Sequence, residues 1–270
     1  MLSLFGAKTR DIASFLEVQR PVVLMGRGHS GTRVLAFACA ELGIQLGVSE
    51  DLATGDADDR PFTDSVKSLC LRTLGLMRPE DVRRRDLRIF QHAVYGYYVR
   101  LGTPDGLWGW KFPETYLVAP LVARAFPRAR YLHLVRDGRD IAFKEHLTDN
   151  PRRKLGKRIL ARRSALGLPR FLQAAHSWSY QVDGFDEFRK SVSPDQVIDI
   201  RFEDLCLEPE QTIARLCRFL DTEFTSGCRD YLRRSINTAK VSQYRENEPD
   251  RTRQVEAAVG DTLRRYGYLA

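Results

Sequence analysis

The sequence predicts an α/β protein in which a central parallel β-sheet is flanked by helices. Two observations predict this class. Four short runs are rich in β-forming residues: PVVLM (21–25), LWGWK (107–111), RYLHLV (130–135) and VIDIR (197–201). Helical patterns follow most of these runs, and such alternation is typical of a parallel sheet with helices on both faces. The first run is apolar throughout, as expected of a central strand that is covered on both sides.

Length and composition favour a single domain. The chain has 270 residues, of which 43% are hydrophobic and 29% charged, which is enough to bury a sizeable core. We expect one domain over residues 1–270, with insertions at about 44–106 and 149–182. The first insertion is irregular apart from an expected helix over Thr63 to Leu76, and we expect it to cover the mouth of a site.

The charge of the chain predicts an anionic partner. The formal net charge is +8 and the isoelectric point is near 9.4. A nucleotide, a sulfated or phosphorylated substrate, nucleic acid and a membrane surface all fit this charge, and charge alone does not choose among them. The run from Arg152 to Arg163 fits a solvated basic helix or a contact with an anionic acceptor or lipid headgroup.

The cysteines and the apolar runs indicate in which cellular compartment the protein is expected. The five cysteines are widely spaced, without a C-x-x-C pair and without histidines at zinc-ligand spacing, so we expect reduced, mostly buried thiols and no zinc site. The N-terminus lacks the pattern of a signal peptide, and no window approaches the ~18 apolar residues of a membrane span. We therefore expect a cytoplasmic enzyme, although a luminal domain separated from its anchor has the same features.

The stretch VVLMGRGHSGTRVLAFA (22–38) predicts a strand, a glycine turn and a helix. The backbone N–H groups of such a turn and of the first helical turn have no intrahelical partner, and they can bind a phosphate or a sulfate. A Walker A loop would read G-x-x-x-x-G-K-[ST]. Here Gly31 is followed by Thr32 and Arg33, so the lysine of nucleotide kinases is missing.

A second anion-binding element is predicted in YLHLVRDGRDIAFKEH (131–146). Arg136 lies at the carboxyl end of a predicted strand, the edge at which open α/β sheets bind ligands. Its planar guanidinium suits a phosphate, and Lys144, about two helical turns further on, would add a charge beside the same anion. Alternatively, Arg136 and Asp140 pair with each other and cap the helix.

These two elements together resemble the family of sulfotransferases that use 3′-phosphoadenosine 5′-phosphosulfate (PAPS). In that family a loop P-[KR]-S-G-T-[TS] binds the 5′-phosphosulfate, and R-D-x-x-D-x-x-x-S binds the 3′-phosphate. Ser30, Gly31 and Thr32 match the first motif, and RDGRDIAFK matches the arginine and both aspartates of the second. Three further patches are similar: WGWKFPETYLVAPLVARAFPRARYLHLVRD, IRFEDLCLEPEQTIARLCRFLD and LRRYGYL.

The resemblance implies a P-loop NTPase-like sulfotransferase fold, PAPS as donor, 3′-phosphoadenosine 5′-phosphate (PAP) as product, and no metal. The donor-binding residues that it implies are Arg27, Gly28, His29, Ser30, Gly31, Thr32, Arg33, Arg136 and Lys144.

The chain departs from the family pattern at two of these positions. His29 stands where the family commonly has Lys or Arg, and Lys144 stands where it has Ser. A phosphosulfate beside His29 would raise its pKa and so favour a charged ligand. Arg27 and Arg33 flank His29 and can take over the permanent charge, while His29 can instead cap the helix.

The resemblance also implies the catalytic groups. Sulfuryl transfer resembles phosphoryl transfer, with charge growing on the bridging oxygen that leaves. His29 and Lys111, the latter in the family's W-x-K-x-P pattern, are candidates to meet that charge. The base for the acceptor hydroxyl is expected in the segment after the first helix, at Glu50 or Asp51, with Asp64 and Glu114 behind them. Trp108 and Trp110 are expected in the core.

We therefore expect transfer of a sulfuryl group from PAPS to an acceptor hydroxyl, on a carbohydrate or glycolipid, with the two insertions shaping the acceptor site. An aromatic patch at Tyr95, Tyr97 and Tyr98 equally suits phenols or lipids. The alternatives are a small-molecule kinase and a non-enzymatic binder of polyanions. Nucleic acid is not an expected partner, whereas peripheral membrane contact and the oligomeric state stay open. A tail segment with Lys240, Tyr244 and Arg245 either folds over the nucleotide or forms a surface helix.

Overall fold

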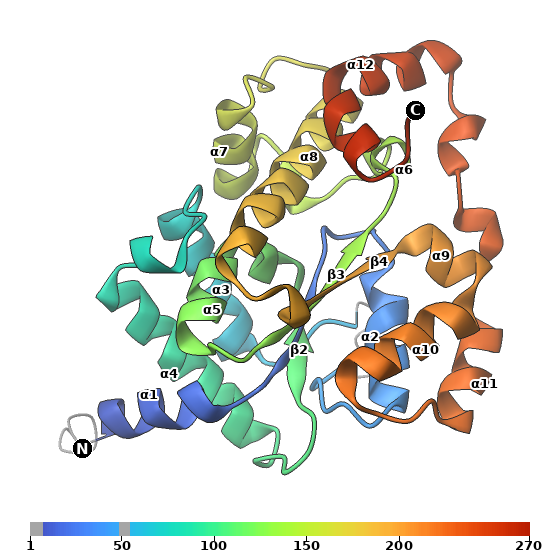
Figure 1. The fold of residues 1–270 in the computed structure, drawn as a ribbon. Coiled ribbons are helices and arrows are strands. Elements are labelled where there is room, and N and C mark those ends of the chain that lie inside the picture. The colour runs from blue at the N-terminus through green and yellow to red at the C-terminus, as the bar shows by residue number, and fades with distance from the viewer. Residues whose placement is uncertain (1–7, 49–54) are drawn as a thin grey trace.

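The computed structural model describes residues 8–48 and 55–270. Its centre is a four-stranded, wholly parallel sheet with the strand order β2-β1-β3-β4 (Figure 1). The strands are β1 (Val22–Met25), β2 (Gly109–Lys111), β3 (Arg130–Val135) and β4 (Val197–Arg201). All four predicted strands and the predicted fold class are confirmed.

Helices surround the sheet and account for most of the remaining chain (Figure 1). In chain order they are α1 (Lys8–Val18), α2 (Thr32–Glu41), α3 (Arg60–Thr73), α4 (Arg84–Arg100), α5 (Ala119–Ala125), α6 (Gly138–Ala142), α7 (Lys154–Arg162), α8 (Arg170–Phe188), α9 (Phe202–Leu207), α10 (Pro209–Leu220), α11 (Ser226–Ser235) and α12 (Pro249–Arg265).

The two faces of the sheet build two separate hydrophobic cores, because successive side chains of a strand point to opposite faces. Val23 and Tyr131 pack with α1, α3, α4, α5 and the end of α8. Leu24 and Leu132 pack instead with α2, α10 and α11. Figure 1 shows these two sets of helices on opposite sides of the strands. Trp110 is fully buried in the first core, and Trp108 lies there too, as predicted.

The expected helix over Thr63 to Leu76 starts and ends three residues earlier, as α3. Asp59 caps its N-terminus by accepting a hydrogen bond from the backbone N–H of Phe62 at 2.9 Å. Pro61 occupies the first turn, where its missing N–H costs nothing. The Asp-Arg-Pro sequence thus sets the start of the helix, and Gly75, at a φ of 90°, follows its end.

The aromatic patch of the first insertion belongs mainly to the core. Tyr97 is 2% exposed and Tyr98 8%, and the Tyr97 hydroxyl donates to the carbonyl of Leu46 at 2.6 Å. Tyr95 packs edge-on against Phe15. The prediction that these tyrosines line a pocket for phenols or lipids is therefore wrong for Tyr97 and Tyr98, whose rings pack in the core.

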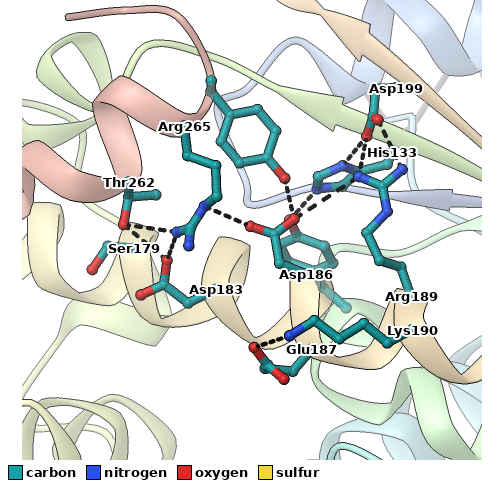
Figure 2. A network of polar contacts seen from close by, with 12 residues as sticks. His133, Ser179, Asp183, Asp186, Glu187, Arg189, Lys190, Asp199, Thr262 and Arg265 are labelled. Carbon is teal, nitrogen blue, oxygen red and sulfur yellow. Dashed lines mark hydrogen bonds and ion pairs between the residues drawn. The ribbon is translucent and has the colours of Figure 1, made fainter.

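A buried polar network joins the middle of the sheet to α8 (Figure 2). His133 of β3 lies between the hydroxyl of Tyr116, 2.5 Å from its Nε2, and the carboxylate of Asp199 on β4, 2.7 Å from its Nδ1. A neutral imidazole with its proton on Nδ1 satisfies both contacts, and burial lowers the pKa of His133. Arg189 donates to the second oxygen of Asp199 at 2.8 Å.

The same network continues to α12, whose Arg265 and Thr262 face α8 in Figure 2. Asp186 accepts a hydrogen bond from the hydroxyl of Tyr266 at 2.5 Å, and its carboxylate lies 3.0 Å from Arg265. Asp183 binds Arg265 and also accepts from Thr262 at 2.8 Å. These carboxylate contacts hold the C-terminal helix against α8.

None of the described helices combines the length and the apolarity needed to cross a membrane.

Candidate active site

The glycine turn after β1 forms a loop that opens α2 at the carboxyl edge of the sheet. The N–H of Ser30 donates to the carbonyl of Arg27 at 3.1 Å, which closes the turn. His29 and Gly31 have φ values of 70° and 90°, in the left-handed region. Gly31 is the N-cap of α2, and within the described residues it has no capping side chain and no acidic residue in the first turn. A helix N-terminus that follows such a glycine turn can bind an anion.

Arg136 lies directly beside this loop. Its guanidinium donates to the carbonyl of His29 at 3.3 Å and pairs with Asp140 at 2.9 Å. It also stacks on the ring of Phe202, 4.3 Å from the ring centroid. A Cβ on Gly31 would lie 2.3 Å from the same ring. Phe202 thus packs between the loop and Arg136, and the two predicted anion-binding elements form one surface.

The pairing of Arg136 with Asp140, which the sequence left open, is present. It does not cap α6, because the N-cap is Asp137, which accepts from the backbone N–H of Arg139 at 2.9 Å. The role of Arg136 as a phosphate ligand stays a prediction.

The predicted position of Lys144 on a two-turn helix is wrong. Helix α6 ends at Ala142, and Lys144 lies beyond it. The backbone leaves the helix at Phe143, and the carbonyl of Lys144 accepts a hydrogen bond at 2.9 Å from Arg27 of the loop. The Lys144 side chain reaches the amide oxygen of Gln243 at 3.4 Å, so it still lies at the same edge of the sheet.

The candidate cations of the loop differ in their surroundings. Arg27 is 1% exposed and forms a buried ion pair with Asp149. His29 contacts the carbonyl of Glu145 through Nε2 at 2.9 Å. Burial, followed by the charge of Arg27, lowers the pKa of His29, so the ring is neutral without an anion. Arg33 contributes a positive charge beside Lys111. Their donor-binding roles stay predictions.

Lys111 ends β2 in a charged cluster. It is 4% exposed and its ammonium lies 2.6 Å from the carboxylate of Asp56. Burial lowers the pKa of Lys111, and the Asp56 carboxylate opposes that shift. Glu114 is also buried beside these two groups, and burial raises its pKa to about 7. A lysine at a strand end with both acids nearby can stabilise or relay charge.

The two leading candidates for the base, Glu50 and Asp51, lie outside the described residues. Of the other two, Asp64 is a surface residue, with a side chain 73% exposed and 3.8 Å from Lys67. Glu114 lies inside the site cluster. Of these two described carboxyl groups, only Glu114 is therefore buried close to Lys111 and Asp56, whereas Asp64 is exposed to solvent.

The tail lies on the second anion-binding element. Residues Thr238–Lys240 and Gln243–Glu246 form two short 3-10 turns rather than a surface helix. The carbonyl of Lys240 accepts from Arg136, and the N–H of Tyr244 donates to Asp140 at 2.7 Å. Arg139 stacks over the ring of Tyr244 at 4.2 Å. The tail therefore reaches the predicted nucleotide site, and its contact with a nucleotide stays a prediction.

Four site residues were missed by sequence reasoning: Asp56, His146, Asp149 and Phe202. The imidazole of His146 packs on Gly28, where an added Cβ would lie 2.4 Å from the ring. Burial and the charges of Arg27, His29 and Lys111 lower the pKa of His146 to about 3. The acidic run SEDLATGDADD was a signal for Asp56. The others depend on contacts between segments far apart in the sequence.

The remaining chemical candidates are structural in the described part of the chain. The five cysteines are free and buried, as predicted. No group of three or more His, Cys, Asp and Glu side chains among the described residues has the arrangement of a metal site. On α7, Leu155 and Ile159 are buried while Arg153, Lys154 and Lys157 are exposed, which fits a solvated amphipathic helix.

A parallel sheet with a glycine turn between its first strand and a helix, and an arginine at the end of the neighbouring strand, defines a P-loop-like α/β protein. The family comparison makes this class specific. The model of the sulfotransferase family matches residues 52–226, more than half of the chain. The chain belongs to the sulfotransferase family.

Curated relatives match at low identity. An uncharacterized protein of Aquifex aeolicus (strain VF5) is 21% identical over 239 residues, covering 84% of this chain and 29% of the relative. A protein-tyrosine sulfotransferase of Drosophila melanogaster is 25% identical over 120 residues, covering 43% of this chain and 21% of the relative. The aligned part thus spans less than a third of the length of either relative.

Solved structures share the fold. The sulfotransferase domain from the curacin biosynthetic pathway has a TM-score of 0.53 at 15% identity, over 90% of this chain and 98% of that domain. A sulfotransferase from Alicyclobacillus acidocaldarius has a TM-score of 0.53 at 19% identity, over 92% and 94%. Mouse sulfotransferase SULT7A1, complexed with PAP, has a TM-score of 0.53 at 12% identity, over 95% and 90%. The predicted P-loop-like sulfotransferase fold is confirmed.

Proposed function

We propose that this sulfotransferase transfers the sulfuryl group of PAPS to an acceptor hydroxyl. The observation that carries the proposal is the contact between the glycine loop and Arg136, whose guanidinium lies 3.3 Å from the carbonyl of His29. One nucleotide with anions at both its 5′ and 3′ ends can therefore meet both elements. The PAP complex of the mouse structural neighbour supports this choice of donor.

The chemistry of the donor set fits such a nucleotide. The first amides of α2 suit the 5′-phosphosulfate, and Arg136 and Lys144 suit the 3′-phosphate. Arg136 now bonds the neutral carbonyls of His29 and Lys240 besides Asp140. A phosphate is a stronger acceptor than a carbonyl, so it can replace those two bonds when the donor binds.

Lys111 would stabilise the charge that develops during transfer. As the acceptor oxygen bonds to sulfur, the bond from sulfur to the bridging oxygen breaks, and negative charge grows on that bridging oxygen. A buried ammonium acts strongly on this charge because little water screens it. Asp56 holds the Lys111 ammonium in place at 2.6 Å.

The acceptor proton goes to a base, and we keep Glu50 or Asp51 as its leading candidates. The described residues on either side of their segment support this. Val48 pairs with Ala57 in an isolated bridge, and the N–H of Ala57 donates to the carbonyl of Lys111 at 2.9 Å. Val48 and Ala57, which lie on either side of this segment in the sequence, are thus paired with each other, and Ala57 bonds the backbone of Lys111. Glu114, with a pKa of about 7, is the alternative in the described cluster.

For the acceptor we propose a hydroxyl of a carbohydrate or glycolipid. The burial of Tyr97 and Tyr98 removes two members of the aromatic patch that suited phenols or lipids. The groove between α3 and α4 is lined by Arg85, Arg88, His92 and Arg100, whose donors suit a polar, hydroxyl-rich or acidic acceptor.

The proposal is tested by transfer of labelled sulfate from PAPS to a panel of glycans, glycolipids, small phenols and tyrosine peptides, with EDTA present. We expect label on a glycan or glycolipid. If label appeared only on phenols or peptides, the proposed donor would stand and the proposed acceptor would be wrong. Phosphate transfer from ATP that requires magnesium would overturn the donor as well.

A further inference from the structure

Arg27 connects the glycine loop to the segment that follows Arg136. Its side chain lies in the interior and does not face solvent, with 1% of the residue exposed. One terminal nitrogen donates to the carbonyl of Gly28 at 2.9 Å. The other donates to the carbonyl of Lys144 at 2.9 Å and pairs with the carboxylate of Asp149. A single guanidinium therefore fixes the backbone of both predicted phosphate-binding elements.

Asp149 is itself anchored on the other side. Its carboxylate accepts from the backbone N–H of His146 at 3.0 Å and lies 3.4 Å from Arg170, the first residue of α8. The neighbouring Thr148 accepts from Ser177 of the same helix at 2.9 Å. The segment from Lys144 to Asp149, to which Arg27 is hydrogen-bonded, is thus anchored to helix α8.

We propose that Arg27 is a positioning residue that sets the separation of the two phosphate sites, and that it does not itself contact the donor. This inference rests on the proposed function, because it assumes a nucleotide with anions at both ends. It replaces the expectation, drawn from the sequence, that Arg27 supplies a permanent charge to the phosphosulfate. Its guanidinium is paired with Asp149, and its side chain, unlike that of Arg136, has no exposed surface through which an anion could reach it.

A fixed separation of the two sites matters because it sets the effective concentration of the second phosphate at its site. Once one phosphate of PAP is bound, the second binds as an intramolecular event, and its gain depends on how closely the second site matches the span of the ligand. If the two elements shift relative to each other, each site still binds a single phosphate. The gain from binding both at once is then lost.

The test is Arg27→Lys in the full chain, studied by titration calorimetry with PAP, adenosine 5′-phosphate and adenosine 3′-phosphate. Lysine keeps the charge for Asp149 but lacks the planar fork that holds both carbonyls. We expect the affinity for PAP to fall about tenfold or more while the affinity for each monophosphate changes less than about twofold. Arg189→Lys is the matched control, since it removes a fork from another Arg–Asp pair at the far end of α8.

Several outcomes would overturn the inference. An equal loss for PAP and adenosine 5′-phosphate would show that Arg27 is a direct ligand of the 5′ group. Unchanged PAP affinity, or a similar loss in Arg189→Lys, would show that the fork has no positioning role. If Arg27→Lys does not fold, the double variant Arg27→Met with Asp149→Leu removes the whole buried pair and is measured in its place. A wild-type chain that binds PAP no better than the monophosphates would overturn the proposed function itself.

Discussion

Helix α8 supports two charged regions that are built differently. Its C-terminal half carries the network around His133, where Arg189 and Arg265 are paired with carboxylates (Figure 2). Its N-terminal half anchors residues 148 and 149, behind the site edge. At that edge Arg136 bonds two main-chain carbonyls besides its one carboxylate. Arginines that are paired with acids alone, or that are fully enclosed as Arg27 is, hold structure together. Arg136 bonds two carbonyls and keeps 6% of its side chain exposed, so it can exchange those bonds for an anion.

This difference predicts that substitutions in one region mainly affect function and that substitutions in the other mainly affect stability. Substitutions at the site edge should lower donor binding or turnover with little effect on folding. Substitutions in the His133 network should lower the free energy of unfolding and leave donor binding intact.

The largest effect is expected for Lys111→Ala. Loss of one preorganised donor for the leaving oxygen should lower kcat by about 100- to 1000-fold, measured as sulfate transfer from PAPS. Circular dichroism checks that the variant remains folded under the assay conditions. The control is Lys190→Ala, which removes an exposed lysine paired with Glu187 at 2.7 Å. Comparable turnover in both variants would contradict the role given to Lys111.

A smaller effect is expected for Arg136→Ala. Loss of charge-assisted hydrogen bonds should weaken PAP by about 10- to 100-fold while adenosine 5′-phosphate keeps most of its affinity. Arg229→Ala, which removes an arginine that stacks on Phe224 of the outer layer, is the control. Equal losses for both nucleotides in Arg136→Ala would place Arg136 at the 5′ end or in the scaffold, and would remove the contrast between the two regions.

In the network, His133→Phe should lower the free energy of unfolding by about 1 to 3 kcal/mol, because the buried Tyr116 hydroxyl then loses its partner. Adding Tyr116→Phe should recover part of this loss, as the unpaired hydroxyl is then gone. Urea unfolding measures the stability, and PAP affinity should not change. A drop in PAP affinity in the folded single variant would connect the network to the site.

The last prediction is a pH dependence of stability that arises from Glu114. Burial raises its pKa from 4.5 to about 7, so the folded chain binds this proton more tightly than the unfolded chain. The stability contributed by the neutral carboxyl is fully present below pH 4.5 and is lost as the pH rises to about 7. Glu114→Gln should remove about one proton from the difference between the two states, which unfolding experiments across this range measure. An unchanged slope would show that Glu114 is not buried as described.

Much of the fold was predictable from short-range signals. The runs of β-forming residues predicted all four strands, and the glycine turn after the first run predicted the helix that begins at Thr32. The start of α3 was misplaced although its signal, an aspartate ahead of a proline, was in the sequence. Propensity and turn chemistry act over a few residues, so they can be read without knowledge of the packing.

The contacts that build the site could not be predicted in the same way. Lys144 was expected about two helical turns beyond Arg136 on the basis of spacing alone, and the sequence does not show that Arg27, far from it along the chain, binds its carbonyl. For the same reason the buried pairing of Arg27 with Asp149 could not be predicted. Contacts between residues far apart in the sequence decide which charged side chains form ion pairs inside the protein. Local sequence patterns carry no information on those contacts.

The central claim is that the loop and the Arg136 element together bind a nucleotide through anions at both ends. Titration calorimetry of the wild-type chain in EDTA tests it most directly. We expect PAP to bind without metal and at least about tenfold more tightly than adenosine 5′-phosphate, as expected of two phosphate sites that act together. Tight binding of ATP with magnesium, together with no binding of PAP, would contradict the account.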